Sequence, residues 1–142
     1  MDLEDDPTLI PAASVVCRRI PPTEIIEEGG ARRVKSSAFT HSSDGSGTSV
    51  VVAHLMGEEA GRQREPRDIL RDHPDCEVWT LSAEEARSAG ESKGHRLGLK
   101  HEPEPDEPGH ANIKWPAELG TSARHRVRRI LAERAFLLDP SG

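Results

Sequence analysis

Short apolar runs separated by turn residues dominate the chain, a pattern typical of short β-strands. The clearest run covers residues 48–55, where β-branched side chains predominate. Glycine, proline, serine and aspartate gather between the runs, at places where turns need them. The runs that we expect to form strands cover residues 14–20, 32–40, 48–55, 76–81, 93–100 and 109–115.

Helix signals occur in three places. Residues 82–85 read S-x-x-E, the capping box that begins a helix, and predict a helix over 83–89 that ends at the following glycine. A proline opens the segment 66–73 and suits the first position of a short helix. Apolar residues near helical spacing predict a last helix from about residue 121 to 136.

The order of these elements does not alternate strictly between strand and helix. It predicts an α+β fold, a mainly antiparallel sheet of five or six short strands with two or three helices. An open α/β layer built from residues 66–115 is the alternative. We expect a flexible, poorly packed acidic tail over residues 1–13 and a single α+β domain over 14–138.

Composition narrows the function classes. The chain has 142 residues and a net charge of −6, which argues against binding nucleic acid over its whole surface. No apolar run approaches the roughly 20 residues that span a bilayer, and the first residues are acidic where a signal peptide would be basic, so we expect no membrane association. Cys17 and Cys76 suit free thiols in a reducing compartment, so the cytoplasm is the expected location.

Reactive side-chain types are densest in the stretch 36–55, which reads as two apolar runs around the polar segment 41–49. We expect a hairpin or strand–loop–strand whose tip carries serine, histidine and aspartate, the types used in nucleophilic catalysis. A structural polar turn explains the same composition. The candidate catalytic residues are Ser43, Asp44 and, from a later strand entry, His110.

Three histidines, His95, His101 and His110, flank the acidic, proline-rich loop 101–108. Histidine and carboxylate groups are metal ligands, but their spacing here matches no H-x-x-x-H, HExxH or Cys/His pattern. We therefore expect an acidic solvated loop, with no metal and no other cofactor. His110 is the exception, because its place at a strand entry could let it act as a base or a ligand.

The last predicted helix is basic in an acidic chain. Its arginines could meet an acidic partner or phosphates, or could pair with the acids of the chain itself. No interleaved aromatic residues support base stacking, so we do not expect nucleic acid as a partner, and an unknown protein is the expected one. The residues expected to bind that partner are Arg124, Arg128 and Arg129.

A fourth candidate joins Arg18 and Arg19 on the first strand to serines on later segments, with Ser37 and Ser49 as the further ligand-binding candidates. An early arginine followed by later serines resembles ADP-ribosyltransferase-like folds, and the resemblance implies a pocket in which the arginine holds a phosphate of NAD. The chain lacks a recognisable motif for the catalytic glutamate of such folds and contains no tyrosine.

A broader pattern joins CRRIPP, SSAF, SSDGSGTSV and PEPDEPGHANI. It resembles short bacterial proteins that carry RRIPP, SSAAF, S-x-D-G-x-x-S-V and P-x-H-A type segments. That group has no established activity, so the resemblance implies a shared fold and a shared site without naming a reaction. The matched positions are Arg18, Arg19, Ser36, Ser37, Phe39, Ser43, Asp44, Ser49, Pro108, His110 and Ala111.

Two functions follow from these patterns. The first is a small accessory or protein-interaction domain that contacts its partner through loops and the basic last helix. The second is an enzyme or a nucleotide-binding effector with a pocket formed by Arg18, Arg19, the 36–49 loop and His110. The second requires these side chains to converge on one concave site, whereas the first does not.

Overall fold

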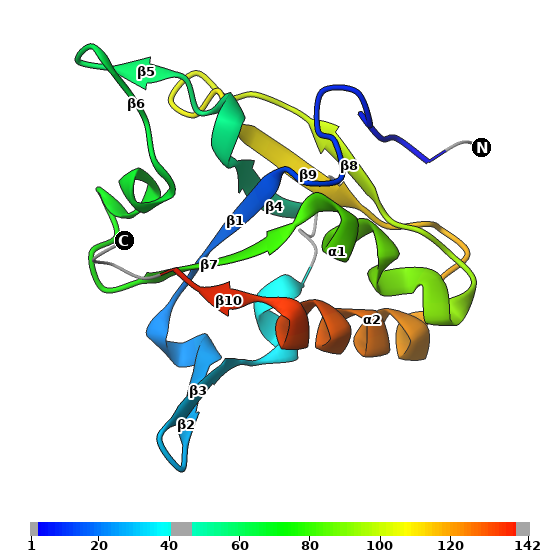
Figure 1. Ribbon diagram of the computed structural model, residues 1–142. Coiled ribbons are helices and arrows are strands. Elements are labelled where there is room, and N and C mark those ends of the chain that lie inside the picture. The colour runs from blue at the N-terminus through cyan, green and yellow to red at the C-terminus, as the bar shows by residue number, and fades with distance from the viewer. Residues whose placement is uncertain (1–2, 41–46, 139–142) are drawn as a thin grey trace.

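A six-stranded sheet forms the centre of the computed structural model, which describes residues 3–40 and 47–138 (Figure 1). Every pairing within it is antiparallel, which confirms the α+β prediction; the described residues do not form the alternative, an open α/β layer. In spatial order the strands are β10 (Phe136–Leu137), β7 (Glu77–Ser82), β1 (Val15–Ile20), β4 (Thr48–Val52), β9 (His110–Lys114) and β8 (Gly98–His101).

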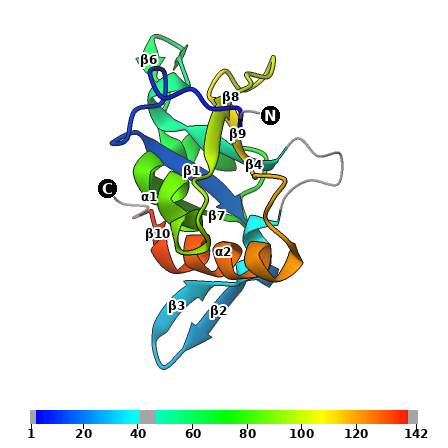
Figure 2. The ribbon, with the colours of Figure 1, turned by 90° about the vertical axis from the view of Figure 1, so that its right-hand side faces the viewer.

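Two small hairpins lie outside this sheet, and the hairpin of β2 and β3 projects away from the body of the molecule (Figures 1 and 2). Their strands are β2 (Ile25–Glu28), β3 (Ala31–Val34), β5 (Glu58–Glu59) and β6 (Arg62–Gln63). The helices are α1 (Ala83–Arg87) and α2 (Thr121–Arg134), with the short 3-10 helices η1 (Pro22–Glu24), η2 (Ser36–Phe39), η3 (Ala53–Leu55), η4 (Pro66–Leu70) and η5 (Ser88–Lys93).

Both α-helices cover the same face of the sheet, and the main core lies between them and the strands (Figure 1). Alternate strand residues point into it, because successive side chains of a strand face opposite sides. Val16, Val52 and Ile113 are fully buried there, together with Phe39 from η2 and Leu131 from α2. Burying each of these side chains contributes about 1.5–3 kcal/mol.

The opposite face is covered only in part. A second cluster there contains the buried residues Cys17, Met56, Ile69 and Val78. The segment 56–70 supplies two of them, so it forms a lobe over β1 and β7. Most of β4 and β9 stays outside this lobe, which leaves an uncovered region of the sheet beside it.

Several predicted elements need correction. The strands predicted over 48–55 and 93–100 are shorter, because β4 ends at Val52 and β8 begins at Gly98. The run 32–40 is not one strand: β3 ends at Val34, and the next turn is the 3-10 helix η2, which buries Phe39 in the main core. The helix after the capping box becomes 3-10 after Arg87 instead of ending at Gly90. Gly90 does not end the helix. It allows the backbone of His95 to pack closely, because a Cβ at position 90 would lie 2.3 Å from the His95 carbonyl oxygen.

The last helix ends at Arg134, two residues before the predicted end, and the chain then joins the sheet as β10. This helix is the longest of the described ones. Across residues 3–40 and 47–138, no helix has both the length and the apolar character needed to cross a bilayer.

The N-terminal segment differs from the poorly packed tail that we expected over residues 1–13. Ile10 is fully buried, and the segment lies along the outer edge of β8. The Asp5 carboxylate accepts hydrogen bonds from the backbone of Leu99 (2.9 Å) and from the buried Arg87 (3.1 Å). Asp6 accepts one from the backbone of His101 (2.8 Å). The described part of this segment therefore belongs to the packed domain.

Candidate functional site

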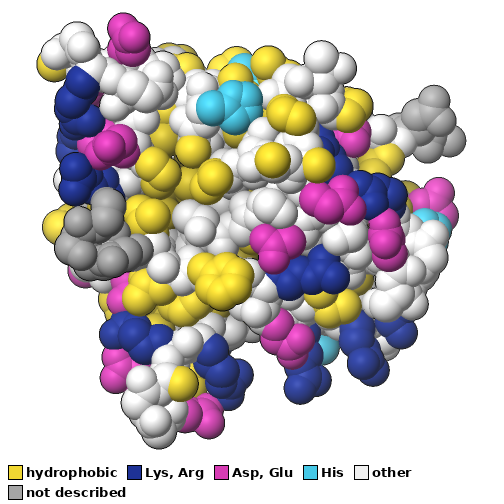
Figure 3. All heavy atoms as spheres, in the orientation of Figure 1, with side chains coloured by type: hydrophobic (Ala, Val, Ile, Leu, Met, Phe, Trp, Pro, Cys, Tyr) yellow, Lys and Arg dark blue, Asp and Glu magenta, His cyan; other side chains and the backbone are white. Residues whose placement is uncertain are grey.

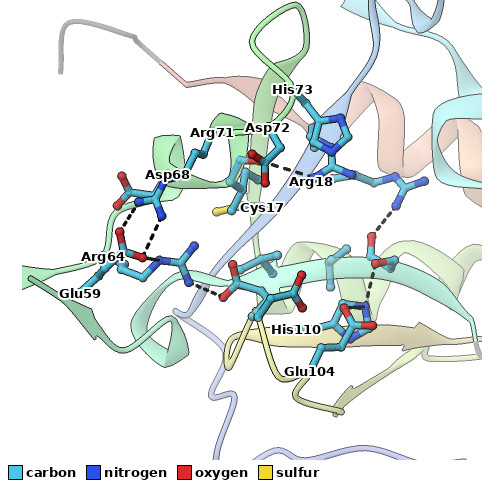
Figure 4. A pocket seen from close by; sticks show the side chains of 17 residues that line it. Cys17, Arg18, Glu59, Arg64, Asp68, Arg71, Asp72, His73, Glu104 and His110 are labelled. Atoms are coloured by element: carbon cyan, nitrogen blue, oxygen red, sulfur yellow. Dashed lines mark hydrogen bonds and ion pairs between the residues drawn. The ribbon is translucent and has the colours of Figure 1, made fainter.

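A hollow of about 540 Å³ lies in the uncovered region of the sheet, between the 56–70 lobe and the loop that connects β8 and β9 (Figure 4). Its floor comes from β1 and β4. Its walls come from residues 59–73 on one side and 104–110 on the other. Two strands with a fixed register thus present their side chains between two walls that are distant in sequence.

Ser49 and His110 form a hydrogen-bonded pair in this hollow, with 2.8 Å between Ser49 Oγ and His110 Nε2. The second ring nitrogen, Nδ1, lies 2.8 Å from the carbonyl oxygen of Glu102. A carbonyl oxygen only accepts, so Nδ1 carries the proton in the neutral ring and Nε2 accepts from the serine hydroxyl. The carboxylate of Glu104 lies 3.8 Å from Nε2, where it can stabilise a protonated ring.

Arg18 stands at one end of the hollow, beside Ser49. Its guanidinium donates to the carbonyl oxygens of Ala38 (2.6 Å) and Ser49, and lies 5.8 Å from the centroid of the Phe39 ring. Burial and the neighbouring charge of Arg19 lower the pKa of Arg18 to about 10. Among the described residues, no carboxylate forms an ion pair with Arg18 or Arg19, although the charge of Glu24 acts on Arg18 from beyond ion-pair distance and partly opposes the lowering of its pKa.

The wall formed by residues 59–73 contains arginines that do pair with carboxylates. Arg64 pairs with Glu107 at 2.9 Å, and Arg71 pairs with Glu59. Figure 4 shows Arg64, Arg71 and Glu59 on one side of the hollow and His110 on the other. Arg64 Nε is buried without a hydrogen bond to any described residue. The hollow is thus charged throughout, but of the four arginines that line it only Arg18 and Arg19 form no ion pair with a described carboxylate.

Cys17 also borders the hollow, and its chemistry can be excluded. Burial, together with the charge of Glu107, raises the pKa of its thiol to about 12. The thiolate is the nucleophilic form of cysteine, so Cys17 is inert at neutral pH. The hydroxyl of Ser49 remains as the nucleophile in contact with a base.

The structure brings Arg18, Arg19, Ser49 and His110 together around one hollow. Ser37 is not part of it, because its hydroxyl donates to Glu24 on the exposed side of η2. Ser43 and Asp44 lie outside the described residues.

The three histidines do not form a cluster. His101 contacts the carbonyl oxygen of Pro108 at 2.7 Å, whereas His110 faces Ser49. Within the described ranges, no group of three or more histidine, cysteine, aspartate or glutamate residues could hold a metal ion. The acidic loop 101–108 is also tied down: Glu104 and Glu107 exchange two backbone hydrogen bonds of 3.0 Å.

The three α2 arginines predicted to bind a partner differ in their contacts. Arg124 donates to the carbonyl oxygens of Leu119 (2.8 Å) and Pro116 (3.1 Å), so it holds the turn before the helix. Arg129 pairs with Glu133 at 3.5 Å, and Arg128 makes no ion pair with any described residue. Figure 3 shows Lys and Arg side chains gathered over α2, at the lower right of the molecule.

Sequence reasoning missed the walls of the hollow. Residues 56–65 are mostly polar, and nothing in that run indicates that Arg64 turns inward. Glu102 and Glu104 were seen only as members of an acidic loop. One available signal was the alternation of His110, Asn112 and Lys114, which places three polar side chains on one face of a strand.

Comparisons of the chain with protein-family models, with curated protein sequences and with solved structures found no match. The two family resemblances of the sequence therefore stay predictions, and function has to be argued from the hollow itself.

Proposed function

We propose that the chain is an enzyme that transfers or hydrolyses the acyl group of an anionic ester, with Ser49 as nucleophile and His110 as general base. One observation carries the proposal: Ser49 Oγ lies 2.8 Å from a histidine nitrogen whose ring is oriented by a second hydrogen bond, at the border of an open hollow. Nucleophile, base and orienting group are the three parts that activate a serine.

The chemistry follows from the proton positions. Ser49 Oγ forms a bond to the acyl carbon while its proton passes to His110 Nε2. The resulting imidazolium keeps its Nδ1–H bond to the Glu102 carbonyl and faces the Glu104 carboxylate at 3.8 Å. His110 then gives the proton to the leaving oxygen as the ester bond breaks. Water attacks the acyl-serine in the second half, with its proton passing through His110 back to Ser49.

Arg18 and Arg19 supply the preference for an anionic substrate. Neither forms an ion pair with a described carboxylate, so a carboxylate or phosphate of the substrate would supply a direct ionic partner. The wall of residues 104–110 carries Glu104 and Asp106, which repel an anionic group. A substrate with one anionic end therefore binds in one orientation, with that end toward the arginines.

The nucleophile is tested with a fluorophosphonate, which reacts with activated serines. Intact-mass spectrometry should find one adduct on the natural chain, no adduct on Ser49→Ala, and an unchanged adduct on Ser14→Ala. Ser14 is the matched control because it also contacts a histidine, His54, at 3.0 Å. Absence of an adduct on the natural chain, or its persistence on Ser49→Ala, would refute the nucleophile.

The arginines are tested with two nitrophenyl esters, the neutral acetate and the anionic succinate monoester. We expect the natural chain to prefer the anionic ester, and Arg19→Gln to remove that preference. Arg71→Gln is the control, since Arg71 also borders the hollow but already pairs with Glu59. An equal loss of preference in both variants would reject the assignment.

The basic face of α2 supports a second function, interaction with an acidic protein segment. The observation in its favour is Arg128, which pairs with no described carboxylate although it lies beside the ion pair of Arg129 and Glu133. Substituting Arg128 and Arg129 by glutamate should abolish binding of a fluorescent polyglutamate peptide, measured by anisotropy. Arg33→Glu on β3 is the control, because Arg33 pairs with Glu28 elsewhere. Unchanged binding by the double variant would exclude this surface.

A further inference from the structure

The base of the proposed reaction has a support of its own. We propose that Glu102, clamped by Asn112 and Lys114, is a positioning residue that fixes the proton and the ring orientation of His110. The contacts stand independently, and their importance for catalysis rests on the proposed function of Ser49 and His110.

Three side chains of β9 converge on Glu102. His110, Asn112 and Lys114 alternate along the strand and so share one face, the side of the sheet away from the main core. His110 Nδ1 donates to the backbone carbonyl of Glu102 at 2.8 Å, and the Glu102 carboxylate accepts from Asn112 (2.8 Å) and Lys114 (2.9 Å). The backbone N–H of Glu102 also donates to the carbonyl of His110 at 3.0 Å.

Glu102 needs such a clamp because of its place in the chain. It follows His101, the last residue of β8, and its N–H makes the last backbone hydrogen bond between this segment and β9. The next residue is Pro103, which has no N–H to donate and which restricts Glu102 to extended conformations. Beyond this point the carboxylate contacts with Asn112 and Lys114 hold Glu102 against β9. They keep its carbonyl oxygen directed at His110.

The partners of the clamp are well placed to hold a charge. Asn112 is buried, and only 13% of the Lys114 side chain is exposed. Burial opposes ionisation of Glu102, but its hydrogen bonds from Lys114 and Asn112 prevail and lower the pKa of its carboxyl. Lys114 also reaches Glu4 at 3.4 Å, so the clamp joins the N-terminal segment to the site.

The test measures directly which nitrogen of the His110 ring carries the proton. Nitrogen-15 NMR of the natural chain should find the neutral His110 ring protonated at Nδ1. We expect Lys114→Met and Glu102→Ala to move part of the population to the Nε2–H form and to slow fluorophosphonate labelling of Ser49 about tenfold or more, the effect typical of losing an outer partner of a functional histidine. Lys114→Arg, which keeps the charge and a donor, should restore both readouts.

Lys100→Met is the matched control, because Lys100 lies on the neighbouring strand opposite Asn112 and bridges to Asp6 instead of Glu102. It should leave the His110 tautomer and the labelling rate unchanged. If Glu102→Ala does not fold, the His110 tautomer and the labelling rate of Lys114→Met test the inference. An unchanged tautomer in folded Lys114→Met, or an equal change in Lys100→Met, would overturn the inference. A shifted tautomer in a chain whose Ser49 never labels would instead reject the proposed function and leave the positioning role intact.

Discussion

The described residues include two serine–histidine pairs that differ in what surrounds them. Ser49 and His110 are 2.8 Å apart, and Ser14 and His54 are 3.0 Å apart, so distance alone does not separate them. Ser14 is 7% exposed and borders no part of the hollow, whereas Ser49 is exposed in it. The second nitrogen of His54 has no partner among the described residues, whereas His110 is oriented by a carbonyl. Space for a substrate and a fixed proton therefore distinguish a candidate site from a structural contact.

The largest expected effect is on the reactivity of Ser49, when the histidine of each pair is replaced in turn. We expect His110→Gln to slow fluorophosphonate labelling of Ser49 about a hundredfold or more, the usual contribution of a positioned base. His54→Gln should leave the labelling rate unchanged. Time courses by intact-mass spectrometry measure both. Similar rates for the two variants would erase the distinction between the pairs.

Disturbing the strand that carries Ser49 should come next. Gly47 precedes β4 at a φ of +113°, and a Cβ there would lie 2.3 Å from the carbonyl oxygen of Ile113. Gly47→Ala should lower the free energy of unfolding by about 2–4 kcal/mol, because neither φ nor space suits alanine. Gly29→Ala is the control: its φ is +56° with nothing within 4 Å, so about 1 kcal/mol is expected. Urea unfolding of both variants checks the ranking, and equal losses would contradict it.

A smaller effect should appear in acid at the Ser49–His110 pair, through Glu102, and not at the Ser14–His54 pair. Because the pKa of Glu102 is lowered in the fold, its ionised contacts stabilise the protein above its ordinary pKa near 4.5, and this stabilisation disappears as pH falls through the lower folded value. Glu102→Gln should cost at most about 1 kcal/mol at pH 7, since solvent screens a carboxylate that is 39% exposed. The difference should vanish in strong acid.

Ser14→Ala provides the comparison for that measurement, because no carboxylate contacts the Ser14–His54 pair among the described residues. Its stability relative to the natural chain should not change between pH 5 and 3. Urea midpoints across this range measure both variants. A loss in Glu102→Gln that persists at low pH would indicate a packing effect instead of a charge effect.

The smallest expected effect concerns the other nucleophile of the hollow. Cys17 has a pKa of about 12, so iodoacetamide at pH 7.5 should modify it far more slowly than an ordinary cysteine and leave labelling of Ser49 unchanged. Cys76 is only partly buried and should react first. Peptide mapping identifies the modified thiol. Rapid modification of Cys17 would show that the hollow supports thiolate chemistry after all.

Local signals in the sequence predicted several elements correctly. The β-branched run gave β4, and Ser82 with Glu85 forms the expected reciprocal cap, with hydrogen bonds of 2.8 and 3.0 Å. The segment around Phe39 was predicted as a strand because it is apolar. It is a 3-10 helix because a fully buried Phe39 has to reach the core beneath α2, and tertiary packing overrides so short a pattern.

The candidate site shows the same limit at longer range. Arg18, Arg19, Ser49 and His110 all carried recognisable chemistry, but each was found in a separate segment. Ser49 and His110 meet because β4 pairs with β9, with Val51 opposite His110, and the arginines reach them because β1 pairs with β4. The sequence of either strand alone does not determine that register. A shift of one residue would turn His110 away from Ser49.

The N-terminal segment protects one edge of the sheet in an unusual way. Asp5 and Asp6 bind the outward N–H groups of β8 with carboxylates, which satisfy the donors without offering a new strand for pairing. At the opposite edge, β10 is uncovered among the described residues, and Phe136 is 68% exposed. A sheet that can grow at one edge only can join a second copy edge to edge, but it cannot extend into a fibre. Self-association through this sheet would therefore end at a dimer.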